Sequence, residues 1–192
     1  MRILILSEFR SGSTSLLNWF NLSVNYSIVF QPITNPKYIS KKKSTKDLIY
    51  TDIRNVDSYH YSTKNIVIKE VTPIDEYELI NLLQKVDKVI VLFREDYENQ
   101  LKSFLFASNT NNWEASYIYD TKYILNKEHL LLDNSKSQIE EYKSKYFSIS
   151  YEDLYYRGKI QKLIDYIGDD DLNLISFPYG RKYRLEKNNK II

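Results

Sequence analysis

The feature that most constrains the fold is a set of five short runs made largely of β-branched, aliphatic and aromatic residues. Each run is near-continuously apolar rather than alternating, which is the pattern of a parallel sheet covered by helices on both faces. The runs are Arg2–Leu6, Tyr26–Phe30, Asn65–Lys69, Lys88–Phe93 and Tyr146–Ser150. Helical patterns accompany them at Ser13–Asn21, Asp75–Val86, Asp96–Ala107, Ser135–Lys145 and Lys159–Ile167. This alternation predicts an α/β, three-layer domain with a central, mainly parallel sheet and right-handed crossovers.

Length and composition set the domain organisation. The 192 residues, 43% of them hydrophobic, suit a single domain over 1–192 with a real core. Two stretches interrupt the strand–helix rhythm. Asn109–Leu132, rich in asparagine and aromatic residues, predicts a helical insertion, and Pro36–Lys46 reads as an exposed polar loop with three solvated lysines.

Charge, cysteine content and hydropathy exclude several classes of partner. The net charge of +2 gives no support for nucleic-acid binding. Without cysteine there is no disulfide framework and no thiolate metal site, and no other metal-ligand cluster is evident. No segment approaches eighteen apolar residues, and the apolar run near the N-terminus is too short for a signal peptide. We therefore expect a soluble, cytoplasmic protein that uses neither a metal nor a membrane.

The first strand leads through Ser7–Thr14 into a predicted helix. In a parallel sheet this turn lies at the carboxyl edge, where ligands bind. A loop that winds onto a helix N-terminus directs several N–H groups and the positive end of the helix dipole to one place, which favours a phosphate-like anion. Gly12 would let the backbone approach that anion closely, and the neighbouring hydroxyls add donors.

This loop departs from the phosphate loop of nucleoside triphosphatases, whose pattern is G-x-x-x-x-G-K-[ST]. Ser7 replaces the first glycine, Ser13 replaces the lysine, and the cation of the loop is Arg10. Without a lysine beside the β- and γ-phosphates, hydrolysis of ATP or GTP fits poorly. A serine and threonine cluster that caps a plain helix is equally compatible with the loop taken alone.

A second candidate anion site follows the Lys88–Phe93 strand. Arg94 stands at the carboxyl end of that strand, where its guanidinium can offer a bidentate fork to a phosphate. Ser103 lies about two and a half helical turns further on and can donate to the same anion. The alternative for Arg94 is a surface arginine paired with Asp96 or Glu98.

The two sites together resemble those of sulfotransferases that use 3′-phosphoadenosine 5′-phosphosulfate (PAPS). The stretch that begins at Arg94 is most similar to the version in bacterial trehalose sulfotransferases, whose arginine-to-serine spacing it shares. Two later patches resemble further family elements in the same order. They are Tyr151-Glu152-Asp153-Leu154, similar to a Y-E-D-L element, and Gly180-Arg181-Lys182, similar to a late basic loop. Taken alone, these two patches could also be helix-start carboxylates and a tail charge pair.

The resemblance implies a P-loop NTPase-like topology, no required metal, and a site for PAPS and its product adenosine 3′,5′-bisphosphate (PAP). Tyr151 would contact the adenosine. The residues implied for the 5′-phosphosulfate are Arg10, Ser11, Gly12, Ser13, Thr14 and Ser15. Those implied for the 3′-phosphate are Arg94, Ser103, Arg181 and Lys182.

Catalysis would need cations beside the sulfuryl group and a general base for the acceptor hydroxyl. Arg10 is the first cation, and Lys69, at the end of its predicted strand, is either a second one or a solvated lysine. Many carbohydrate sulfotransferases have a glutamate after the second strand, whereas this chain has Gln31 there. Glu70 is our preferred substitute, followed by His60 and Glu8, and a very acidic acceptor would need no base.

Three functions remain open from the sequence. The first is sulfuryl transfer to a hydroxyl of a carbohydrate or small molecule, the second is a kinase with a degenerate phosphate loop, and the third is a non-catalytic PAPS- or PAP-binding module. The acceptor would bind around Asn109–Leu132 and Pro32–Tyr61. The aromatic side chains available there for stacking on an acceptor, or for packing on the core, are Trp113, Tyr117 and Tyr119.

Overall fold

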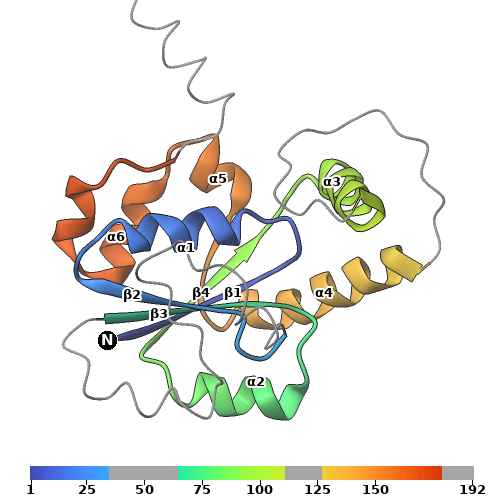
Figure 1. Ribbon diagram of the computed structural model, residues 1–192, viewed down its shortest axis with the longest axis horizontal. Helices are drawn as coiled ribbons and strands as arrows, with labels where there is room; N and C mark the ends of the chain where they lie inside the picture. The colour runs from blue at the N-terminus through green and yellow to red at the C-terminus, as the bar shows by residue number, and fades with distance from the viewer. Residues whose placement is uncertain (35–64, 111–126, 179–192) are drawn as a thin grey trace, which may run out of the picture.

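The computed structural model describes residues 1–34, 65–110 and 127–178, which form an α/β domain around a five-stranded, all-parallel sheet (Figure 1). The strand order is β2-β3-β1-β4-β5. The strands are β1 (Arg2–Ser7), β2 (Tyr26–Phe30), β3 (Asn65–Val71), β4 (Lys88–Phe93) and β5 (Phe147–Ser150). The predicted α/β class and parallel sheet are confirmed.

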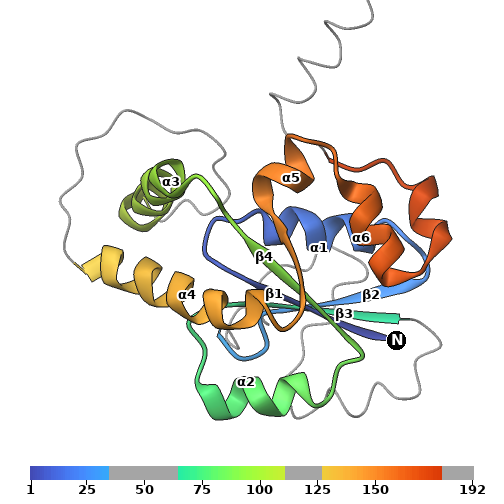
Figure 2. The same cartoon turned by 180° about the vertical axis from the view of Figure 1, so that it is seen from behind.

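Helices cover both faces of the sheet. α1, α5 and α6 lie on one face, α2 and α4 on the other, and α3 lies beyond the carboxyl end of β4 (Figures 1 and 2). The α-helices are α1 (Ser13–Asn21), α2 (Glu76–Leu83), α3 (Tyr97–Thr110), α4 (Lys127–Lys143), α5 (Tyr151–Tyr155) and α6 (Ile160–Ile167). A 3₁₀ helix, Asp170–Leu174, follows α6.

Each central strand divides its apolar side chains between two cores, because successive residues of a strand point to opposite faces. Ile3 and Ile5 of β1 pack in the core beneath α1, together with Phe20. Leu4 and Leu6 pack in the core beneath α2 and α4. The near-continuous apolar runs of the sequence therefore reflect burial on both faces.

β3 is longer than predicted. It continues past Lys69 to Val71, because Leu6 and Ser7 of β1 pair with Glu70 and Val71. Lys69 and Glu70 thus lie inside a paired strand and not at or beyond its end, so their side chains point to opposite faces of the sheet. The predicted bounds of β2 and β4 agree with the structure.

Helix ends follow local capping. Asp75, predicted as the first helical residue of α2, is instead its N-cap and accepts hydrogen bonds from the N–H groups of Tyr77 and Glu78. Gly168 ends α6 in the left-handed conformation (φ 69°), which glycine adopts without strain.

The predicted insertion over Asn109–Leu132 is only partly described. Its first residues complete α3, and its last residues belong to α4, which begins at Lys127 and not at the predicted Ser135. Residues 111–126, which include the three aromatic candidates for acceptor contact, lie outside the described residues. Within the described parts of the chain, no helix is both long enough and apolar enough to span a membrane.

Candidate anion-binding site

The loop between β1 and α1 ends at Gly12, which is the N-cap of α1 and makes no side-chain cap hydrogen bond. Arg10 and Gly12 both adopt positive φ angles, 58° and 82°. Ser11 is buried and donates to the carbonyl oxygen of Glu8 at 2.8 Å. The helix is therefore not capped by a serine or threonine, and its first N–H groups, at Ser13 and Thr14, have no carbonyl partner within the helix.

Gly12 is closely packed by two tyrosines of α5. A Cβ atom at this position would lie 2.8 Å from Tyr151 Cδ2 and 2.8 Å from Tyr155 Cε2. The Tyr155 hydroxyl also donates to the Gly12 carbonyl oxygen at 2.7 Å. The sequence interpretation assigned this glycine to close approach of an anion. The structure adds a packing reason, since the glycine lets α5 lie directly against the loop.

The two predicted anion sites meet at one place. Arg10 Nε donates to Ser103 Oγ at 2.8 Å, and Arg94 Nη1 donates to the Arg10 carbonyl oxygen at 3.2 Å. Burial and the charge of Arg94 lower the pKa of Arg10. Residues that are far apart in the sequence thus place two guanidinium groups and a hydroxyl beside the start of α1.

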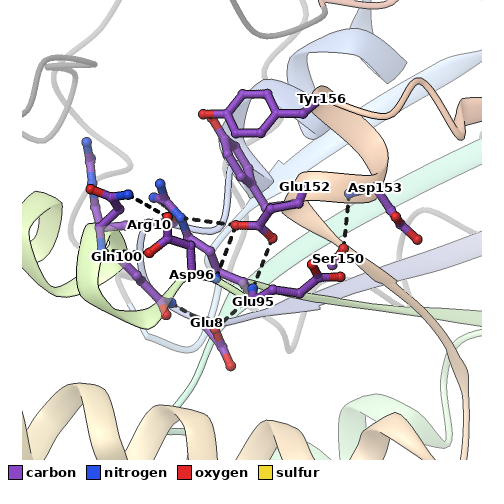
Figure 3. A network of polar contacts seen from close by, with 12 residues as sticks. Glu8, Arg10, Glu95, Asp96, Gln100, Ser150, Glu152, Asp153 and Tyr156 are labelled. Atoms are coloured by element: carbon purple, nitrogen blue, oxygen red, sulfur yellow. Dashed lines mark hydrogen bonds and ion pairs between the residues drawn. The ribbon is translucent and has the colours of Figure 1, made fainter. Parts of the chain in front are cut away.

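Arg94 is held by the Y-E-D-L segment. Its guanidinium lies over the Tyr151 ring, 4.7 Å from the centroid, and its Nε is 3.6 Å from Glu152 Oε1. The carboxylate of Glu152 also accepts from the N–H groups of Glu95 and Asp96, at 2.9 and 3.3 Å (Figure 3). Arg94 Nε is buried and has no hydrogen-bond partner in the part of the chain that the structure describes. The alternative pairing of Arg94 with Asp96 or Glu98 is not what the structure shows for this arginine.

Glu8 lies beneath the loop and is only 1% exposed. Its Oε2 accepts from Gln100 Nε2 at 2.8 Å (Figure 3). The same oxygen accepts from the Arg94 N–H at 3.1 Å, and Oε1 is 3.5 Å from Lys136 Nζ. Burial raises the pKa of Glu8, against the opposing effects of Lys136 and the hydrogen bonds. The sequence interpretation named neither Gln100 nor Lys136 as a contact of this carboxylate. A glutamate inside an anion-binding loop needs hydrogen-bond donors or a cation to offset its charge, and this was the sequence signal that such partners exist.

Lys69 lies on the same face of the sheet as α1. Its Nζ donates to Thr14 Oγ1 at 2.9 Å and is 4.3 Å from the centroid of the Phe30 ring. The pKa of Lys69 is lowered to about 7, mainly by burial; Glu70 opposes the shift and the charge of Arg10 adds to it. The structure therefore brings this predicted cation to the loop, in an environment that favours its neutral form.

Glu70 faces the other side of the sheet. Its carboxylate accepts from the Ile33 N–H at 2.6 Å, from the Thr34 N–H at 3.3 Å and from the Thr34 hydroxyl at 2.7 Å. Burial raises the pKa of Glu70 to about 7, and these hydrogen bonds oppose the rise. Gln31, in the left-handed region with φ 44°, donates through Nε2 to Thr34 Oγ1 at 3.2 Å. Glu70 thus secures the turn after β2.

Of the remaining predicted site residues, some lie in the described part of the chain and some do not. Ser13 is buried and Ser15 is exposed, both in the first turn of α1. Three predicted site residues lie outside the described residues, namely His60, Arg181 and Lys182.

Comparison with known proteins identifies the fold. No family model matches the chain, and no curated protein matches its sequence. Among solved structures, the chain is similar to mouse sulfotransferase SULT7A1 complexed with PAP, with a TM-score of 0.53 and 13% sequence identity. The match covers 90% of this chain and 61% of the mouse chain, so this chain spans less than two thirds of that sulfotransferase. The all-parallel sheet and its helices therefore have the P-loop-like fold of sulfotransferases.

Proposed function

We propose that this chain binds PAPS and transfers its sulfuryl group to an acceptor hydroxyl of a carbohydrate or small molecule. The observation that carries the proposal is the contact between the two candidate anion sites, in which Arg10 Nε donates to Ser103 Oγ and Arg94 donates to the Arg10 carbonyl oxygen. PAPS carries anionic groups at both the 3′ and the 5′ positions. A ligand of that kind needs two cationic positions that are separate but adjacent.

The residues present fit such a ligand. Among the described residues, Arg94 Nε has no hydrogen-bond partner and lies 3.6 Å from the nearest carboxylate oxygen, Glu152 Oε1. The first N–H groups of α1 have no carbonyl partner within the helix. We assign Arg10, Ser11, Gly12, Ser13, Thr14 and Ser15 to the 5′-phosphosulfate. Arg94 and Ser103 would bind the 3′-phosphate, and Tyr151, which lies against both Gly12 and Arg94, would contact the adenosine. Arg181 and Lys182 are proposed to close over the 3′-phosphate.

In the proposed reaction the acceptor oxygen attacks sulfur in line with the bond to the 5′-phosphate. The new oxygen–sulfur bond forms as the bond from sulfur to the phosphate oxygen breaks, and PAP leaves with the bonding electron pair. Arg10, protonated Lys69 and the N–H groups of α1 would stabilise the charge that develops on the sulfuryl and phosphate oxygens. The proton of the acceptor hydroxyl must pass to a base.

Glu70 remains our proposed base, ahead of His60 and Glu8. Its raised pKa, about 7, suits proton abstraction near neutral pH. However, Glu70 is fully buried and both of its oxygens accept from the turn at Ile33 and Thr34. Its action as a base therefore requires this turn to move, and requires the acceptor hydroxyl to approach from the face of the sheet opposite Lys69.

A PAPS- or PAP-binding module without transferase activity is the second candidate. It is favoured by the engagement of Glu70 with the turn after β2, and by Gln31, whose amide cannot accept a proton. This module would use the same two anion sites and would lack only the chemical step.

Thermal unfolding with PAP, ATP and ADP tests the proposal, since a ligand that binds only the folded state raises the melting temperature. We expect a clear rise with PAP and little change with ATP or ADP. Indifference to PAP would refute the proposal, and preference for ATP would favour a kinase with a degenerate loop. Transfer of labelled sulfate from PAPS to an acceptor panel would then separate the enzyme from the binding module.

A further inference from the structure

Glu8 presents an electrostatic problem at the proposed site. It is a buried carboxylate two residues before Arg10, in a loop proposed to bind an anion. An unpaired carboxylate here would repel that anion and would be costly to bury. The structure supplies a counter-charge from a different helix, because Lys136 of α4 lies with its Nζ 3.5 Å from Glu8 Oε1.

The contacts of Glu8 extend to both anion sites. Its Oε2 accepts from the Arg94 N–H and from Gln100 Nε2, and the same amide group of Gln100 donates to the Phe9 carbonyl oxygen at 2.7 Å. Lys136 Nζ donates to the Arg94 carbonyl oxygen and to Gln100 Oε1, each at 3.3 Å. One carboxylate and one ammonium group therefore tie together the β1–α1 loop, the end of β4, α3 and α4.

The position of this cluster relates it to ligand selection. Phe9, held by Gln100, precedes Arg10, and Ser103 follows Gln100 by about one helical turn on α3. Arg94, held through both its N–H and its carbonyl oxygen, carries the second guanidinium. The cluster thus holds Arg94 directly, and through Phe9 and Gln100 it holds the backbone near Arg10 and Ser103.

We infer that Glu8, Gln100 and Lys136 form a positioning cluster that fixes the spacing between Arg10 and Arg94, and thereby selects ligands with phosphates at two separate positions. The selection of a two-phosphate ligand rests on the proposed function, whereas the fixed spacing between Arg10 and Arg94 does not. None of the three residues needs to touch the ligand. Lys136 acts through Glu8, because its charge keeps Glu8 an acceptor for donors from both anion sites.

The first measurement uses the ligand-free protein. Exchange of the Arg10 Nε–H with solvent, followed by NMR, reports the hydrogen bond to Ser103. Because a hydrogen bond to a charged group is worth about a tenfold change in an equilibrium, we expect exchange to be roughly tenfold faster in Lys136→Met and in Glu8→Gln. Lys136→Arg should restore slow exchange.

Lys143→Met is the matched control. Lys143 lies on the same helix and also pairs with a carboxylate, Glu140, at 2.8 Å, but it has no described contact with the β1–α1 loop. Its removal should leave Arg10 exchange unchanged. Unchanged exchange in both Lys136→Met and Glu8→Gln, or equal acceleration in the control, would overturn the inference.

The second measurement compares affinities for PAP and for adenosine 5′-monophosphate, which lacks the 3′-phosphate. If Lys136→Met or Glu8→Gln disturbs the spacing between Arg10 and Arg94, the affinity for PAP should fall about tenfold and that for the monophosphate less than about twofold. The ratio of the two affinities therefore falls. A purely structural cluster would lower the melting temperature and leave this ratio intact, which would contradict ligand selection. The double variant Glu8→Gln, Lys136→Met avoids an unpaired buried carboxylate and should lose no more selectivity than either single variant.

The two measurements separate failure of the inference from failure of the proposed function. A wild-type protein that binds no PAP would refute the proposed function and the selection of a two-phosphate ligand. Arg10 exchange in the ligand-free variants would still decide whether the cluster positions the loop.

Discussion

Two regions at the carboxyl edge of the sheet contrast sharply in how they use charge. In the β1–β4 corner, defined by Arg10, Arg94 and Ser103, side chains from separate segments contact one another directly. In the β2–β3 edge, defined by Lys69 and Glu70, two adjacent residues of one strand point to opposite faces. The groups proposed to bind the donor are therefore gathered together, whereas the proposed cation and base of the chemical step are separated by the sheet itself.

The pKa values of the β2–β3 edge show the consequence of this separation. Burial is the largest cause of both shifts, and it moves the pKa of Lys69 down and that of Glu70 up, each to about 7. The attraction between the two charges opposes both shifts and is the smaller effect in each case. Strand alternation thus prevents an ion pair that would otherwise hold both groups charged.

The largest effect is expected from Gly12→Ala, which disturbs the packing of the loop at the β1–β4 corner. A methyl group would lie 2.8 Å from both Tyr151 and Tyr155 at a positive φ, so the free energy of unfolding should fall by about 3 kcal/mol. Gly168→Ala is the control, because it has a similar φ of 69° and, its two chain neighbours aside, no described atom within 4 Å of the added methyl group. Its cost should be about 1 kcal/mol, measured by urea unfolding. Equal costs would show that α5 does not pack on the loop as described.

The next effect concerns the binding of PAP by Arg94. Arg94→Ala should weaken PAP about a hundredfold and adenosine 5′-monophosphate little, since a charge-assisted hydrogen bond contributes about 2–3 kcal/mol. Titration calorimetry would measure both affinities. Arg157→Ala is the control, because this exposed arginine pairs with Glu95 and Asp153 and its loss should change PAP affinity less than about twofold. If Arg94→Ala weakened the binding of PAP and of adenosine 5′-monophosphate equally, Arg94 would not be the residue that binds the 3′-phosphate.

A third prediction tests Glu70 through stability. Its pKa is raised in the folded state, so the native protein binds more protons between the ordinary pKa of about 4.5 and about 7, and its stability falls as pH rises through this range. Glu70→Gln should flatten that part of the stability profile by on the order of 2 kcal/mol. Urea unfolding at several pH values would measure the change. An unchanged slope would mean that Glu70 is ionised throughout, which would weaken its case as a base.

The smallest predicted effect tests Lys69 as a cation of the loop. Its lowered pKa means that it loses its charge as pH rises through about 7, so PAP affinity should fall about tenfold toward pH 9. The phosphate groups are fully ionised over most of this range and do not mask the loss. Lys69→Arg keeps the charge and should remove the pH dependence. If the affinity of the wild-type protein for PAP is constant from pH 7 to 9, Lys69 does not contribute its charge to the donor site.

Much of the fold could be predicted from the sequence, because burial on both faces makes the strands continuously apolar. The end of β3 could not, since Lys69 and Glu70 are polar and only pairing with neighbouring strands extends the strand through them. The start of α4 was missed for a related reason. Leu130 and Leu131 are exposed while Leu132 is buried, so the three consecutive leucines hide the helical period.

The candidate site divides in the same way. Arg10, Arg94 and Ser103 lie in short motifs next to strand ends, so their types and spacing were visible in the sequence. Lys136 was not predicted, because its contact with Glu8 depends on how α4 packs against the loop, which no local pattern encodes. The opposite orientation of Glu70 followed from the length of β3, and the error in that length concealed it.

Calorimetric titration with PAP, adenosine 5′-monophosphate and adenosine 3′-monophosphate tests the central claim most directly. If the β1–β4 corner joins two anion sites, PAP should bind at one site per chain and at least about tenfold more tightly than either monophosphate. Binding of PAP no tighter than that of the better monophosphate, or no binding at all, would contradict the account.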